Sequence, residues 1–174
     1  MTEPTPTNWD ESGTLEVLTF DIGGETLALE AVLVREILDL LPETVVPGAP
    51  PLVASVINFR GRIIPLADLR VAFGMPSGDR TVDSRIVVIE IATEDEPIHI
   101  GLRADKVHEV ATLRRDSSEP PPAIGMRWRR DYVRDLVRHA DGVVILPDLP
   151  AIFHSSLAGE GGDSAQRPAS TVHQ

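Results

Sequence analysis

The chain has 174 residues, a length that fits one domain or two small ones. It carries 16 basic and 27 acidic residues, and this net charge of -11 opposes nucleic-acid binding because recognition of phosphates needs a basic surface. Cysteine is absent, which excludes disulfides, thiolate metal sites and cysteine nucleophiles.

The sequence gives no indication of a membrane segment. No apolar run approaches the roughly 20 residues that a membrane-spanning helix needs. The first residues lack both the basic start and the apolar stretch of a secretory signal. We therefore expect a cytoplasmic protein without direct membrane insertion.

The two ends are predicted to be disordered tails. Residues 1–13 show no apolar periodicity, and residues 155–174 consist mostly of Ser, Gly, Ala and polar types. Neither end can bury enough apolar surface to offset the loss of chain entropy. The predicted folded domain is 14–154.

Strand patterns dominate the predicted domain from its first residues. Alternation over 15–21 is followed by Gly23-Gly24, which suits a hairpin turn, and by a return strand over 25–30. The next apolar runs are 55–60 and 62–66, which meet at Gly61.

Further strands are expected in the second half of the chain. The segment 84–93 (SRIVVIEIAT) is the richest in β-branched residues, and Asp141-Gly142 marks another hairpin turn. The remaining predicted strands are 98–103, 107–113, 132–139 and 143–146, and short helices are predicted at about 31–38, 67–73 and 148–153. The pattern predicts a mainly β fold with short helices.

The sequence also repeats itself weakly. The segment VREI at 34–37 aligns with VHEV at 107–110 at an offset of 73 residues, and the same offset lays 15–20 over 88–93. We infer two similar β subdomains, roughly 14–80 and 81–154. Units of this size bury too little surface alone, so the two should share a hydrophobic core.

The residues offer little support for catalysis. The chain has no G-x-S-x-G elbow, no phosphate-binding P-loop and no dinucleotide-binding G-x-G-x-x-G after a strand. Asp68 and Asp148 each precede a leucine, an arrangement typical of a helix N-cap. A small metal-binding β enzyme that uses Asp, Glu and His is the alternative from another functional class.

The segment 55–70 is more informative. Asn58 and Arg60 interrupt two apolar runs, and Gly61 permits a sharp reversal of the chain. This places an amide and a guanidinium beside a turn, where the planar donors of arginine suit recognition of a partner protein. A solvated hairpin tip is the competing interpretation.

At these residues the sequence resembles the CheW family, the coupling proteins of bacterial chemosensory arrays. The resemblance covers 14–154 in the family's order, and the N-x-R-G turn followed by I-P-x-x-D-L-R is its most specific part. The matching segments are LTFDIGGETLAL at 18–29, VREI at 34–37, VINFRG at 56–61, IPLADLR at 64–70, GLRADKVHEV at 101–110 and VILPDLPAIF at 144–153.

The resemblance implies an all-β fold of two five-stranded, SH3-like barrel subdomains around one core. It implies a non-enzymatic adaptor without a cofactor or metal, which bridges the cytoplasmic tip of chemoreceptors to the regulatory domain of the histidine kinase CheA. Other CheW-like domains are further candidate partners. The receptor tip would lie in the groove between the subdomains, and the receptor-binding candidates carried over by motif are Val34, Glu36, Asn58, Arg60, Gly61, Val107 and Val110.

The chain departs from the family pattern at three positions. Ser55 and Asp135 stand where the family has glycine, and Phe59 replaces leucine. These departures leave open a scaffold of a non-flagellar pathway that controls pili or surface behaviour. A detached regulatory module of a kinase is a further alternative.

Overall fold

The computed structural model describes residues 5–123 and 129–155. Its strands in chain order are β1 (Thr14–Ile22), β2 (Glu25–Glu30), β3 (Val34–Asp39), β4 (Glu43–Val45), β5 (Ser55–Phe59), β6 (Arg62–Ala67), β7 (Arg85–Ile91), β8 (Ile98–Ala104), β9 (Lys106–Arg114), β10 (Ser118–Glu119), β11 (Val133–His139) and β12 (Gly142–Pro147). The helical segments are short: α1 (Leu69–Ala72), the 3₁₀ turns η1 (Ala31–Leu33), η2 (Pro51–Val53), η3 (Arg115–Ser117) and η4 (Arg130–Tyr132), and a helix at 149–155.

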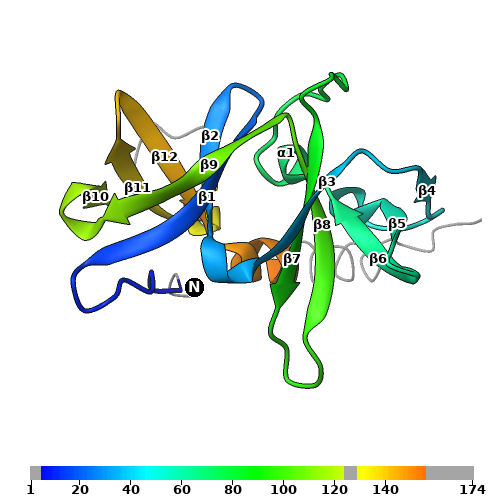
Figure 1. Cartoon of the computed structure of the whole chain (residues 1–174), viewed down its shortest axis with the longest axis horizontal. Coiled ribbons are helices and arrows are strands. Elements are labelled where there is room, and N and C mark those ends of the chain that lie inside the picture. Colours follow the sequence, from blue (N-terminus) through cyan, green and yellow to red (C-terminus); the bar gives the residue numbers. More distant parts are fainter. Residues whose placement is uncertain (1–4, 124–128, 156–174) are drawn as a thin grey trace, which may run out of the picture.

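The strands form two sheets that lie side by side (Figure 1). Within the described residues, sheet A has the order β10-β11-β12-β2-β1-β9 and sheet B the order β3-β7-β8-β6-β5-β4. Both sheets are open rather than closed barrels, and each has six strands because a short edge strand, β4 or β10, adds to the five longer ones. The mainly β, two-part fold is confirmed.

The two sheets exchange strands between the repeats found in the sequence. Sheet A combines the first hairpin, β1–β2, with β9 to β12, whereas sheet B combines the hairpin β7–β8 with β3 to β6. The chain therefore crosses from one sheet to the other at η1 and at Asp105, and the sheets do not divide the chain near residue 80. The physical reason is pairing: the second strand of each hairpin pairs in parallel with the last strand of the other repeat.

Apolar side chains fill three clusters, and alternation along the strands assigns each residue to one of them. The central cluster lies between the sheets and includes Leu18, Phe20, Leu27, Leu69, Val87, Ile89 and Leu102. On β1 and β2, Leu18, Phe20 and Leu27 point to this cluster, while Val17 and Ala28 point to the other face. The sheet A cluster comprises Val17, Ala28, Leu113, Val137, Val144 and Leu146. The sheet B cluster comprises Ile57, Phe59, Ile64, Leu66, Ile86 and Val88.

The remaining expectations have mixed outcomes. The short helices near 67–73 and 148–153 are confirmed by α1 and by the helix at 149–155. The helix expected over 31–38 is wrong, because η1 ends at Leu33 and β3 then pairs with β7. Residues 5–13 contact the domain instead of forming a free tail, while residues 1–4 and 156–174 lie outside the described residues.

No helix in the described part of the chain is long and apolar enough to cross a membrane.

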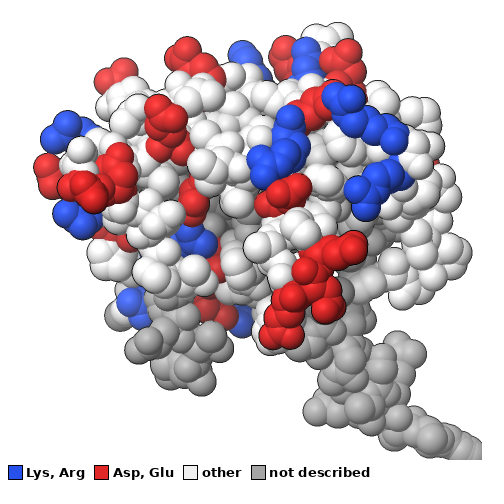
Figure 2. Space-filling view, turned by 60° about the horizontal axis from the view of Figure 1, so that its bottom comes forward, with Lys and Arg blue, Asp and Glu red and all other residues white. Residues whose placement is uncertain are grey.

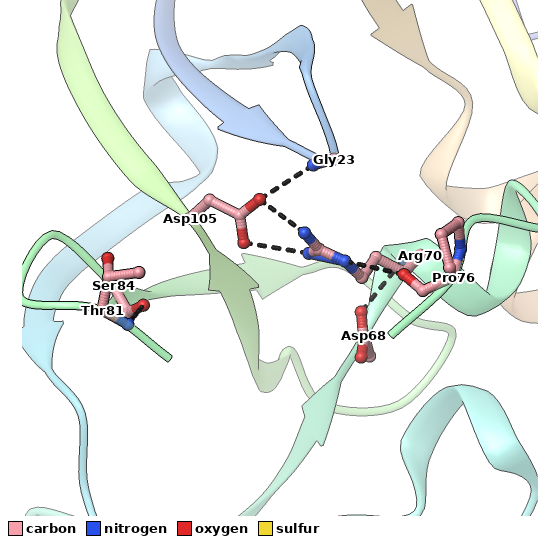
Figure 3. A network of polar contacts seen from close by, with 7 residues as sticks. All are labelled: Gly23, Asp68, Arg70, Pro76, Thr81, Ser84 and Asp105. Carbon is pink, nitrogen blue, oxygen red and sulfur yellow. Dashed lines mark hydrogen bonds and ion pairs between the residues drawn. The ribbon is translucent and has the colours of Figure 1, made fainter. Parts of the chain in front are cut away.

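A fork of hydrogen bonds joins the two sheets at the Asp105 crossover (Figure 3). Arg70 follows the N-cap Asp68 of α1, and its two terminal nitrogens donate to the two carboxylate oxygens of Asp105 at 2.9 and 2.6 Å. The same carboxylate accepts the backbone N–H of Gly23, in the β1–β2 turn, at 2.8 Å. The Arg70 side chain is 13% exposed, so this contact is shielded from water on the arginine side.

Replacing Arg70 should destabilise the whole domain. We expect Arg70→Ala to lower the free energy of unfolding by about 1–3 kcal/mol, because it leaves a partly buried carboxylate without its charged donor. The matched control is Arg80→Ala, since Arg80 is 58% exposed and its partner Glu43 keeps a second arginine, Arg103. Urea denaturation followed by circular dichroism measures both, and equal losses in the two variants would contradict a special role for Arg70.

Candidate functional site

The β5–β6 hairpin holds its turn in a left-handed conformation. Arg60 has φ 51° and Gly61 has φ 80°, and Phe59 pairs directly with Arg62, which defines a two-residue turn with positive φ at both central residues. The side-chain oxygen of Asn58 accepts the Gly61 N–H at 2.9 Å. Glycine adopts this conformation freely, whereas for arginine it costs roughly 1–2 kcal/mol.

The unusual backbone at Arg60 directs its side chain to β3. Its Nε donates to Glu36 Oε1 at 3.0 Å, and a terminal nitrogen donates to the same oxygen. The guanidinium carbon also lies 5.4 Å from the ring centroid of the buried Phe59, within cation–π range. Arg60 is nevertheless 70% exposed, so most of its fork faces solvent and is available to a partner.

The predicted valines lie on edge strands of the two sheets. Val34 opens β3 and Val107 lies on β9, opposite Phe20, and both are half-buried against the central cluster. Val110 is 60% exposed on β9. In Figure 1, β3 and β9 border the region between the sheets.

The structure thus divides the seven predicted receptor-binding residues into two groups. Asn58, Arg60, Gly61 and Glu36 gather at the β5–β6 turn as two hydrogen-bonded pairs, Gly61 with Asn58 and Arg60 with Glu36. The valines present apolar surface beside the seam between the sheets. Whether these residues bind a receptor stays a prediction.

The structure adds two exposed apolar residues that sequence reasoning missed. Ile37, next to Glu36, is 43% exposed, and Ile63, opposite Asn58 in the hairpin, is 67% exposed. In the sequence, Ile63-Ile64 is one apolar run, but only Ile64 enters the sheet B cluster. Strict alternation from Ile64 was the available signal, since neighbouring strand residues face opposite ways.

A second polar network lies on the same sheet. Arg35 Nη2 donates to Glu90 Oε2 at 2.9 Å, and His99 Nε2 lies 3.2 Å from the other Glu90 oxygen. The hydrogen bond from Arg35 holds the pKa of Glu90 below its usual range. The His99 ring also meets Phe59 edge to face at 6.1 Å, which connects this network to the base of the hairpin.

The three departures from the family pattern each make a local contact. Ser55 is buried and donates through Oγ to Glu43 Oε1 at 3.0 Å. Phe59 contributes the ring beside Arg60, and Asp135 accepts a hydrogen bond from the hydroxyl of Thr7. The structure therefore gives each replacement a partner.

Charged side chains of both signs occur on the described surface. On the face shown in Figure 2, several basic side chains gather at the upper right, an acidic group lies at the lower right, and charges of both signs lie next to each other at the left. The described residues hold no group of three or more His, Asp or Glu side chains arranged to bind a metal ion.

Two cavities lie away from the hairpin. A largely apolar cavity of about 230 Å³ lies beside η1 and is lined by Leu33, Ile91, Leu146, Leu149 and others. Its polar wall is the pair Arg134–Glu30, joined at 2.8 Å. A polar cavity of about 260 Å³ adjoins Arg70 and Asp105.

Comparison with known proteins identifies the family of the chain. The family model "CheW-like domain" matches residues 16–157. The chain is 28% identical to the chemotaxis protein CheW of Rhizobium meliloti (strain 1021), over 83% of this chain and 90% of that protein. It is 33% identical to the chemotaxis protein CheW of Thermotoga maritima, over 84% of this chain and 92% of that protein.

A solved structure supports the same assignment. The crystal structure of the scaffolding protein TtCheW from Thermoanaerobacter tengcongensis superposes with a TM-score of 0.70 at 30% identity, covering 80% of this chain and 92% of that one. The match covers most of both chains. The chain belongs to the family of CheW-like domains, which are non-enzymatic scaffold and adaptor proteins of chemotaxis.

Proposed function

We propose that this chain couples the cytoplasmic tips of chemoreceptors to the regulatory domain of the histidine kinase CheA. Membership of the family supports the adaptor role, and the Arg60–Glu36 arrangement is the observation that supports the receptor site. A charged fork is held in a costly backbone conformation and still faces solvent. Such strain is typical of positions that a fold maintains for function.

The receptor surface combines polar and apolar contacts. Arg60 and Asn58 offer directional hydrogen bonds, while Val34, Val107 and Val110 offer apolar area to a helical tip. Because the Glu36 carboxylate already holds part of the guanidinium, Arg60 pays little rotamer entropy when a partner binds. The site thus favours a preorganised, moderately polar interface.

The adaptor would act through geometry and local concentration. Two weak contacts on one rigid scaffold raise the effective concentration of the second partner to the millimolar range for a short connection. A receptor change reaches the kinase if it alters how the scaffold lies against the kinase domain. The shared central cluster supplies the rigidity, since it ties both sheets into one body.

Reversing the charge of Arg60 should weaken receptor coupling. We expect Arg60→Glu to reduce co-sedimentation with receptor arrays at least tenfold, because it removes the fork and places two carboxylates together beside β3. Arg62→Glu is the matched control, since Arg62 is an exposed arginine of the same hairpin. Unchanged co-sedimentation of Arg60→Glu, with a native circular dichroism spectrum, would refute the receptor site.

A second variant separates the guanidinium from the turn. Asparagine tolerates positive φ better than arginine, so Arg60→Asn should keep the melting temperature within about 2 °C of wild type while receptor binding falls. Thermal unfolding and the same sedimentation assay measure the two effects. If Arg60→Asn binds receptor arrays normally, the turn alone matters and the guanidinium has no role in recognition.

A further inference from the structure

The N-terminal segment contacts sheet A through alternate residues. The backbone N–H and hydroxyl of Thr5 donate to the two carboxylate oxygens of Asp148 at 2.9 and 3.3 Å, and the Thr7 hydroxyl donates to Asp135. Trp9 packs against the sheet A cluster, whereas Pro6 and Asn8 are exposed. We call residues 5–9 the strap.

Trp9 covers the sheet A cluster, whereas leucines from β3 and the residues after it cover the sheet B cluster. The sheet B cluster is covered by Leu38, Leu40 and Leu41. In the sequence repeat, with its offset of 73 residues, these three leucines correspond to Ala111, Leu113 and Arg114. Leu41 is thus replaced in sheet A by Arg114, whose side chain is 68% exposed. Trp9 supplies apolar surface to the sheet A cluster from another part of the chain.

The two carboxylates beneath the strap depend on its donors. Asp148 is fully buried and caps the helix at 149–155 by accepting the Ala151 N–H at 3.1 Å, while Thr5 supplies two further donors. A buried carboxylate that loses donors is destabilised. Asp135, on β11, accepts the Thr7 hydroxyl at the second anchor of the contact.

A fixed turn joins the strap to β1. Asp10 accepts the backbone N–H groups of Ser12 and Thr14, each at 2.9 Å, and the Thr14 hydroxyl at 2.8 Å. These donors hold the pKa of Asp10 below its usual range. The turn therefore keeps the strap close to sheet A, while the strap itself is held by three side-chain hydrogen-bond contacts and one half-buried aromatic ring.

We propose that this face of sheet A is a peptide-docking surface, and that the strap is its resident ligand. The surface recognises a segment with an aromatic side chain and with hydroxyl-bearing residues two and four positions before it, turned at Asn8 by the hydrogen bond from the Trp9 N–H to the Thr7 carbonyl. The same segment from a second copy of this chain binds there once the strap has been released.

Tethering controls when the surface is free. A ligand on a short connection has an effective concentration in the millimolar range, so a free peptide of similar intrinsic affinity competes poorly with it. The apparent dissociation constant of the free peptide equals its intrinsic value divided by the fraction of chains in which the strap is released. Weakening the strap should therefore strengthen binding of a peptide supplied in solution.

The direct test uses the full chain and a labelled peptide of residues 1–13. In fluorescence polarisation, we expect saturable binding to the full-length Thr7→Ala/Trp9→Ala variant and at least tenfold weaker binding to the wild-type chain. The same peptide with Trp9→Ala should bind neither the variant nor the wild-type chain. Absence of binding to a variant that keeps its native circular dichroism spectrum, or equal binding to both chains, would overturn the proposal.

A second measurement tests Asp135 as the acceptor for the strap. The chain has two tryptophans, so Trp128→Phe leaves Trp9 as the only reporter of strap position. In that background, Asp135→Asn should raise acrylamide quenching of Trp9 at least twofold, whereas Asp141→Asn, in the exposed β11–β12 turn, should not change it. Equal quenching in both variants would show that Asp135 does not hold the strap.

Discussion

The structure depends on the central apolar cluster shared by the two sheets. Strands such as β1 and β7 bury side chains on both faces, with alternate residues in the central cluster and in the cluster of their own sheet. Because each sheet takes its hairpin from one repeat and its remaining long strands from the other, neither repeat contains a complete core. The Arg70–Asp105 fork fixes the crossover where this exchange takes place.

The exchange also explains how a scaffold without catalytic residues can present a defined surface. The edge strands β3 and β9 come from different sheets, yet Val34 and Val107 pack on the same central cluster, so their separation is set by the core. The hairpin turn then adds Arg60, which its ion pair with Glu36 orients across to β3. A preorganised surface of this kind loses little entropy on binding, which suits an adaptor that holds several partners.

The N-terminal strap is the clearest difference between two otherwise similar halves. In sheet B, Leu38 of β3 and the following Leu40 and Leu41 cover the cluster, whereas in sheet A Trp9, from the segment before β1, packs against it. The polar anchors at Asp135 and Asp148 fix where the strap lies. Equivalent faces of the two repeats thus present different surfaces to the surroundings, although their strands follow the same order.

Local sequence patterns determined most of the long strands, the hairpin turns and the family, because alternation and turn chemistry act over a few residues. They also found the Asn58–Gly61 turn, whereas the receptor-binding valines came from the resemblance to the family. Only the tertiary structure decided that 34–39 is a strand, since its alternating burial appears once β7 lies beside it. It likewise decided the strand exchange, the Arg60–Glu36 and Arg70–Asp105 pairs, and the contact of the strap, residues 5–9, with sheet A. These contacts join residues far apart in the chain, and no local propensity specifies which distant partner a strand, an arginine or a strap will meet.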